Sequence, residues 1–82
     1  MTEKRYIIYG RDGCPYCSFA QDFCQAKGLE IVYLDYTSRT EALKDCMAFY
    51  KMKTVPIILE NDLETGLTRL VGGYTDLLEF LK

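Results

Sequence analysis

Hydrophobic side chains recur along the first half of the chain with two different periods, which predict two strands around one helix. Residues 5–9 and 30–35 are short apolar runs rich in β-forming side chains. Between them, Ala20 and Cys24 recur at helical spacing, and Pro15 suits the first position of the helix because its missing N–H costs nothing there. A single helix that connects neighbouring strands makes them parallel, so we expect a parallel β-α-β unit.

A second helix is predicted after this unit. Residues 38–41, Ser-Arg-Thr-Glu, match a capping box, in which the Ser and Glu side chains pair with backbone N–H groups at the start of a helix. Leu43, Met47 and Tyr50 follow on one helical face, as expected for a helix that packs one side against a sheet.

The remaining residues predict a hairpin and a short final helix. Residues 54–59 and 67–71 have strand character, and the turn-rich residues 61–66 join them as a hairpin. Two glycines, residues 72–73, end the second strand, and an apolar helix begins near Thr75. The resulting order, β-α-β-α-β-β-α, predicts an α/β, thioredoxin-like fold with a four-stranded mixed sheet and helices on both faces.

Composition then narrows the classes of function. The 82 residues contain no repeat and no linker-like stretch, so we expect residues 1–82 to form one domain. Ten Lys and Arg against twelve Asp and Glu leave no basic excess, which argues against a nucleic-acid partner. The absence of histidine excludes Ser-His-Asp and Cys-His nucleophile pairs and His-containing zinc sites. No apolar run suits a signal peptide or a membrane span, so we expect a cytoplasmic protein without a membrane partner.

The candidate chemistry lies in a Cys-x-x-Cys motif at the predicted junction of strand and helix. If Pro15 is the first helical residue, Cys14 occupies the N-cap, where unpaired N–H groups and the helix dipole favour its thiolate. Arg11 can add positive charge nearby, whereas Cys17 lies one turn inside the helix. We therefore expect Cys14 to attack a disulfide and Cys17 to resolve the mixed disulfide that forms.

Two other interpretations of the motif are a structural disulfide and half of a metal site. A permanent disulfide is unusual in a cytosolic chain. A zinc site needs four ligands, and without histidine only Cys24, Cys46 or carboxylates are left, so we expect no metal site. Both of those cysteines lie on apolar helical stripes and are interpreted as small buried hydrophobes, with a regulatory thiol as the alternative.

Three segments together resemble the signature of the dithiol glutaredoxins. They are residues 10–17 (Gly-Arg-Asp-Gly-Cys-Pro-Tyr-Cys), residues 54–56 (Thr-Val-Pro) and residues 72–76 (Gly-Gly-Tyr-Thr-Asp). The resemblance spans essentially the whole chain and is greatest to short bacterial and phage members. Thioredoxin itself is less similar, because Trp is absent and the active-site tetrapeptide differs.

The resemblance implies a glutathione-dependent thiol–disulfide oxidoreductase that acts as a monomer. Glutathione would serve as reductant and co-substrate rather than as a tightly bound cofactor. The substrates would be protein disulfides and glutathionylated proteins, ribonucleotide reductase among them. A thioredoxin reductase as electron source is one alternative, which Thr75 and Asp76 disfavour. An iron–sulfur carrier that uses Cys14 of two protomers is another, and Pro15 argues against it.

The resemblance also implies a binding site. Pro56 would be cis and would turn the Val55 backbone towards an extended substrate, unless it is an ordinary edge-strand proline. Asp76 would bind the free amine of glutathione, stabilise the last helix, or do both. Arg11 and Lys53 would face the glycyl carboxylate, although either could be a solvated charge. The expected glutathione-binding residues are Arg11, Tyr16, Thr54, Val55, Pro56, Gly73, Tyr74, Thr75 and Asp76.

The chain departs from the family pattern at two places. Ile57 follows the expected cis proline, where bacterial members carry a polar residue, which would bear on the choice of substrate. The hairpin is longer than in compact members, and we expect its tip at residues 61–66 to lie away from the cysteines. Phe19 falls off the apolar stripe of its helix, and we expect it to be exposed beside the active site, available to a protein partner.

Overall fold

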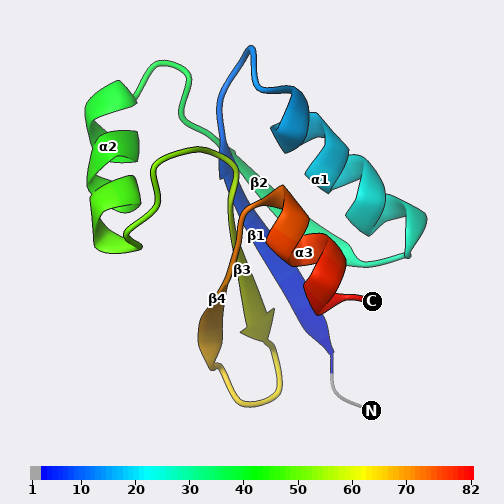
Figure 1. Cartoon of the computed structure of the whole chain (residues 1–82). Helices are drawn as coiled ribbons and strands as arrows, with labels where there is room; N and C mark the ends of the chain where they lie inside the picture. The colour runs from blue at the N-terminus through cyan, green and yellow to red at the C-terminus, as the bar shows by residue number, and fades with distance from the viewer. Residues whose placement is uncertain (1–2) are drawn as a thin grey trace.

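The computed structural model describes residues 3–82, and its first half is the parallel β-α-β unit that the sequence predicts (Figure 1). Strand β1 (Lys4–Gly10) pairs in parallel with β2 (Glu30–Asp35), and helix α1 (Pro15–Ala26) connects them. Side chains alternate across β1, so Tyr6, Ile8 and Gly10 all face α1. The apolar stripe of α1 packs on this face, where Ala20 is fully buried.

The second half adds helix α2 (Thr40–Phe49), strands β3 (Ile57–Asp62) and β4 (Thr68–Gly72), and helix α3 (Tyr74–Phe80). Strand β3 is antiparallel to β1 and to β4, so the sheet has the order β2-β1-β3-β4 and is mixed. The predicted thioredoxin-like fold is therefore confirmed.

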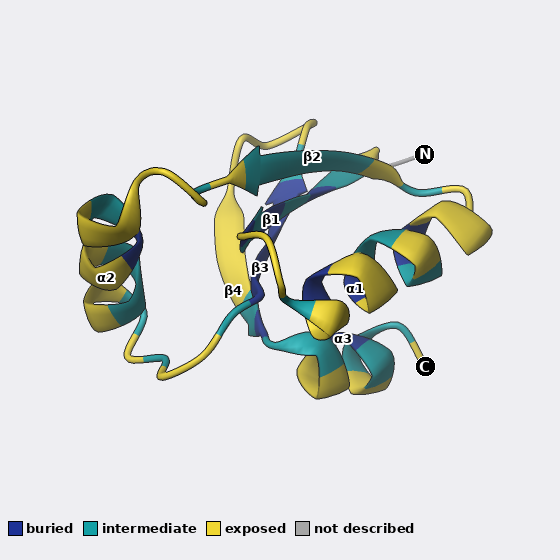
Figure 2. Ribbon diagram, turned by 90° about the horizontal axis from the view of Figure 1, so that it is seen from above, coloured by how far each residue is buried: buried dark blue, intermediate teal, exposed yellow. Residues whose placement is uncertain are grey.

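The helices lie in separate layers on the two faces of the sheet (Figure 2). Helices α1 and α3 cover one face, and the main core lies beneath them, with Tyr6, Ile8, Cys24, Ile58 and Leu77 buried. Helix α2 lies on the opposite side and buries only Leu43. No helix among residues 3–82 is long and apolar enough to cross a membrane.

Two sequence predictions need correction. The third strand begins at Ile57 rather than at Thr54, because Pro56 has no N–H to donate to a ladder and residues 54–56 form a loop instead. The predicted capping box at residues 38–41 does not form: Arg39 is the N-cap of α2, without a side-chain capping bond. The Arg39 N–H instead donates to Tyr36 O at 2.9 Å and closes a turn around Ser38.

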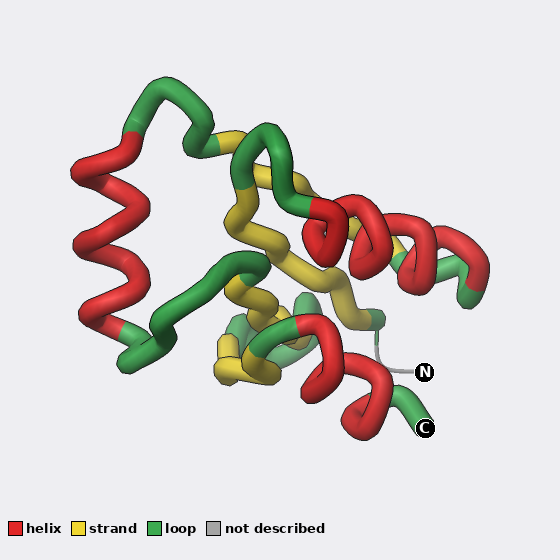
Figure 3. The backbone as a smooth tube through the Cα atoms, turned by 45° about the horizontal axis from the view of Figure 1, so that its top comes forward, coloured by secondary structure: helices red, strands yellow, loops and turns green. Residues whose placement is uncertain are grey.

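Three loops meet at one end of the sheet (Figure 3). Because β1 and β3 are antiparallel, the loop after β1 lies beside the segment before β3, and the turn that follows β4 reaches the same end. The hairpin between β3 and β4 lies at the opposite end, as expected (Figure 1). The topology thus brings the three signature segments, residues 10–17, 54–56 and 72–76, to one place.

Candidate active site

The two cysteines of the Cys-x-x-Cys motif form a disulfide at the start of α1. Cys14 is the N-cap residue in extended conformation, and the Cys17 N–H donates to Cys14 Sγ at 3.2 Å. Cys14 is half-buried, whereas Cys17 is 1% exposed. The expected asymmetry is present: Cys14 is the accessible sulfur, and a backbone N–H is directed at it, which stabilises a thiolate there after reduction.

The segment before β3 packs against this disulfide. The Val55–Pro56 peptide bond is cis, as the resemblance implies. The carbonyl oxygen of Val55 lies 3.7 Å from Cys14 Sγ, so the backbone of this segment forms one side of the approach to the reactive sulfur. Ile57, the residue that departs from the family pattern, is completely buried and belongs to the core rather than to the surface beside the cysteines.

A glycine at the end of β1 forms the floor below the disulfide. A Cβ atom built on Gly10 would lie 2.9 Å from Cys17 Sγ and would also collide with the Tyr33 hydroxyl. Only glycine leaves room for both groups. The strand predicted from the sequence ends at residue 9 and leaves Gly10 outside it, and Tyr33 was not predicted as a site residue. The available signal was the alternation of β1, which puts Gly10 on the same face as Tyr6 and Ile8.

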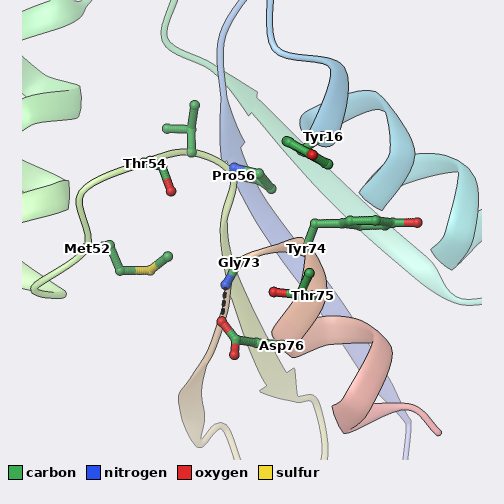
Figure 4. A pocket seen from close by; sticks show the side chains of 9 residues that line it. Tyr16, Met52, Thr54, Pro56, Gly73, Tyr74, Thr75 and Asp76 are labelled. Atoms are coloured by element: carbon green, nitrogen blue, oxygen red, sulfur yellow. Dashed lines mark hydrogen bonds between the residues drawn. The ribbon is translucent and has the colours of Figure 1, made fainter.

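Two hollows that share Tyr16, Thr54 and Val55 adjoin beside the disulfide, and together we call them the active-site groove. The first has a volume of about 330 Å³ and lies between α1, the segment before β3 and the start of α3 (Figure 4). The second, of about 350 Å³, continues past Cys14 to the loop after β1. Together they are lined by all nine residues expected to bind glutathione: Arg11, Tyr16, Thr54, Val55, Pro56, Gly73, Tyr74, Thr75 and Asp76.

Besides residues 13–15 of the cysteine motif, three more side chains line the groove. Lys53 lies in the second hollow with Arg11, as the resemblance implies for the two cations. Met52 in the first hollow and Met47 in the second were not predicted as site residues. Met47 is on the predicted inward stripe of α2, whereas no pattern in the sequence identifies Met52, which follows the end of that helix.

Asp76 has a structural role at the far end of the groove. Its Oδ2 accepts a hydrogen bond from the Gly73 N–H at 2.9 Å and so caps α3 (Figure 4). Gly72 has a φ of 124° and passes so close to the Asp76 side chain that a Cβ there would collide with it. The glycine pair therefore allows the tight turn that brings Asp76 to the groove.

An aromatic cluster flanks the groove on the α1 side. The rings of Tyr16 and Tyr74 stack with centroids 5.8 Å apart, and Phe19 packs edge-on against Tyr16 at the same centroid distance. Tyr16 is 57% exposed and Phe19 is 48% exposed. The predicted exposure of Phe19 beside the active site is confirmed.

The two other cysteines differ from each other. Cys24 is completely buried among core residues, and burial raises the pKa of its thiol. Cys46 is only half-buried, so the expectation that both are buried is wrong for this residue. The reason is that α2 packs loosely and buries only Leu43. Within residues 3–82, no group of three or more His, Cys, Asp or Glu side chains is arranged to hold a metal ion.

A cysteine pair at a helix N-terminus, facing a cis proline at one end of a mixed four-stranded sheet, is typical of the thiol–disulfide oxidoreductases of the thioredoxin fold. The family comparison is more specific: the glutaredoxin model matches residues 6–62. The chain belongs to the glutaredoxin family.

Solved structures agree with this assignment. The solution structure of glutaredoxin from Brucella melitensis is similar with a TM-score of 0.72 and 30% identity, over 94% of this chain and 77% of that one. The structure of reduced Escherichia coli glutaredoxin is similar with a TM-score of 0.64 and 29% identity, over 94% of this chain and 92% of that one. Glutaredoxin 1 from Francisella tularensis, solved with cacodylate, shares the fold at 23% identity and a TM-score of 0.65, over 95% and 92%. No curated protein sequence matches the chain.

Proposed function

We propose that this glutaredoxin is a glutathione-dependent oxidoreductase that reduces protein disulfides and glutathione mixed disulfides. The observation that carries the proposal is the active-site groove, whose two adjoining hollows share Val55 and extend from Cys14 to Asp76. The chemistry of its lining suits an extended tripeptide whose thiol must reach one sulfur.

The groove offers a partner for each part of glutathione. The backbone of Val55 lies beside Cys14 Sγ, where it can pair with the backbone of the cysteinyl residue. Arg11 and Lys53 supply positive charge for the glycyl carboxylate at one end. Asp76 at the other end supplies a carboxylate for the free amine, and its hydrogen bond from Gly73 holds that carboxylate in place. Tyr16 and Tyr74 would form the wall and Thr54, Pro56, Gly73 and Thr75 the remaining contacts.

The groups of the enzyme and co-substrate that exchange bonds in the reaction are the two cysteines and glutathione. The Cys14 thiolate attacks a protein disulfide, forms a mixed disulfide and releases one substrate thiolate. The Cys17 thiolate then attacks Cys14 Sγ, which closes the disulfide seen here and releases the second substrate thiolate. One glutathione thiolate reopens this disulfide by attack on Cys14 Sγ. A second removes the bound glutathione as glutathione disulfide, so two electrons pass from two glutathione molecules to the substrate.

Removal of glutathione from a glutathionylated peptide tests the proposal. The assay contains glutathione, NADPH and glutathione reductase, and it compares the wild type with Cys14→Ser and Cys17→Ser. We expect turnover in the wild type, retained turnover in Cys17→Ser and none in Cys14→Ser, because Cys14 alone exchanges with the mixed disulfide. A wild type that turns over only with thioredoxin reductase would contradict glutathione dependence.

The physiological setting forms part of the same proposal. We infer a cytoplasmic monomer whose partners are disulfide-containing or glutathionylated proteins, with ribonucleotide reductase as one candidate. Phe19 and Tyr16 offer exposed aromatic surface beside the disulfide for such a protein. Reduction of an oxidised ribonucleotide reductase by the wild type and by Phe19→Ala tests this partner.

A further inference from the structure

Tyr33 of β2 reaches the buried side of the active-site disulfide. In the register of the sheet it pairs with Ile8 of β1, and its ring lies on the face that α1 covers. The Tyr33 hydroxyl and Cys17 Sγ both border the space that a side chain on Gly10 would occupy. The absence of a side chain on Gly10 thus lets the Tyr33 phenol and the resolving sulfur approach the same position from two sides.

The Tyr33 hydroxyl is available as a hydrogen-bond donor. Within residues 3–82, this hydroxyl has no hydrogen-bond partner in the protein, and because no buried polar side-chain atom lacks a partner there, it borders the solvent of the hollow that Tyr33 lines. Burial raises the pKa of Tyr33, and the nearby carboxylates of Asp35 and Asp12 raise it further. The phenol therefore keeps its proton at every pH at which a thiol–disulfide exchange enzyme works.

Cys17 needs such a donor more than Cys14 does. Cys17 is 1% exposed, so its thiolate cannot be stabilised by solvent, and its own N–H is directed at Cys14 Sγ. A hollow of about 440 Å³ lies beyond the disulfide. It is lined by Arg11 and Asp12 from the loop after β1 and by the neutral Ser18 and Gln21 from α1. The charged groups that face this region are therefore Arg11 and the carboxylates of Asp12 and Asp35.

We propose that Tyr33 is a further functional residue of the dithiol reaction, whose hydroxyl donates a hydrogen bond to the Cys17 thiolate. This inference rests on the proposed function for its co-substrate. When a glutathione thiolate attacks Cys14 Sγ, the Cys14–Cys17 bond breaks and its electron pair leaves on Cys17 Sγ, towards Tyr33. In the reverse sense, the same hydrogen bond holds Cys17 as a thiolate before it attacks the mixed disulfide. Tyr33 keeps its proton throughout.

The test is Tyr33→Phe, which removes only the hydroxyl. The first measurement is the pKa of Cys17 in the Cys14→Ser background, from the pH dependence of iodoacetamide labelling of the Cys17 peptide read by mass spectrometry. We expect the Phe variant to raise that pKa by about one unit, a tenfold loss of thiolate at a fixed pH below it. Tyr36→Phe is the matched control, because Tyr36 packs edge-on against Tyr9 instead of facing the disulfide.

The second measurement is the rate at which Cys17 resolves a mixed disulfide on Cys14. We expect Tyr33→Phe to slow this step about threefold near neutral pH, since a more basic thiolate is rarer but a better nucleophile. In the Cys17→Ser background the Phe substitution should change nothing further, because the atom on which the hydroxyl acts is gone.

Two outcomes would overturn the assignment. One is an unchanged Cys17 pKa in a folded Tyr33→Phe variant, and the other is an equal loss of activity with and without Cys17, which would make Tyr33 a packing residue. The labelling experiment contains no glutathione, so its result is independent of whether the wild type uses glutathione. Failure of the proposed function would appear in the deglutathionylation assay instead.

Discussion

The polar groups at the two ends of β1 have different surroundings. Near its first residues, Tyr6 donates to Glu60 Oε2 at 2.7 Å and Arg69 Nε donates to Oε1 at 3.0 Å, with Lys4 Nζ 3.6 Å from the same oxygen. The Glu60 side chain is only 6% exposed, yet both of its oxygens have partners within the protein. At the other end, beyond Gly10, polar groups line an open groove beside a disulfide.

This difference separates stability from function along one strand. The hydrogen bonds and ion pairs of Glu60 within the protein stabilise the fold, whereas the charged groups around the active-site groove are available to a ligand. We therefore expect substitutions at the Glu60 end to lower stability without changing chemistry. Substitutions at the Gly10 end should alter chemistry, and two of them test whether the separation is complete.

The largest stability effect is expected for Glu60→Ala. The substitution leaves the buried Tyr6 hydroxyl without its acceptor and Arg69 without its carboxylate. Because Arg69 is more than half exposed and can be rehydrated, we expect a loss of about 2–3 kcal/mol, below the cost of breaking a fully buried pair. Chemical denaturation measures the loss, and turnover per folded molecule should equal that of the wild type. A fall in turnover would show that the two ends are coupled.

Glu79→Ala is the control for this experiment. Glu79 forms a surface ion pair with Lys82 in which both side chains are more than three-quarters exposed, so we expect little change in stability. A loss as large as that of Glu60→Ala would contradict the argument from burial.

A smaller loss of stability is expected for Gly10→Ala. This residue lies at the end of β1 beside the disulfide, where one substitution can affect both stability and function. The added methyl group would lie 2.9 Å from Cys17 Sγ and would press on the Tyr33 hydroxyl. Over-packing of this kind costs about 1–3 kcal/mol, and we expect about 2 here. Unlike Glu60→Ala, this variant should also slow resolution by Cys17, measured as in the Tyr33 experiment. If Gly10→Ala is destabilised but its Cys17 resolves the mixed disulfide at the wild-type rate, the contact of Gly10 with Cys17 and Tyr33 has no part in the reaction.

The Asp76 side chain has a structural role and a proposed binding role, and two substitutions distinguish them. Asp76→Ala removes the cap on the Gly73 N–H, which costs about 1 kcal/mol, and it removes the proposed partner of the glutathione amine. Asp76→Asn keeps an oxygen for the cap and loses the charge, so it should raise the KM for glutathione with a smaller loss of stability. If Asp76→Asn keeps both the stability and the KM for glutathione of the wild type, the charge of Asp76 has no part in binding.

The strands, the helices and the place of the reactive cysteine follow from local signals in the sequence. Alternation and helical spacing predict the elements, and Pro15 after Cys14 predicts an N-cap thiol, which the structure confirms. The cis state of Pro56 came from the resemblance, since a proline at a strand start has no local signal for it. Gly10 and Tyr33 could not be paired from sequence, because their approach depends on the register of two strands and on the position of α1. The capping box failed because a turn around Ser38 competes for the same residues.

The smallest effect is the pH dependence that Glu60 contributes. Burial alone would raise the pKa of Glu60, but the hydrogen bonds from Tyr6 and Arg69 and the charge of Lys4 outweigh it and hold the pKa below its ordinary value of 4.5. A carboxylate whose pKa is lowered on folding contributes stability that is fully present above its unfolded value and is lost as the pH falls through the folded value. We therefore expect the unfolding free energy of the wild type to fall below about pH 4.5 more steeply than that of Glu60→Gln, which cannot titrate. Equal slopes for the two proteins in acid would mean that folding leaves the pKa of Glu60 unchanged, and the contrast between the two ends of β1 would then rest on packing alone.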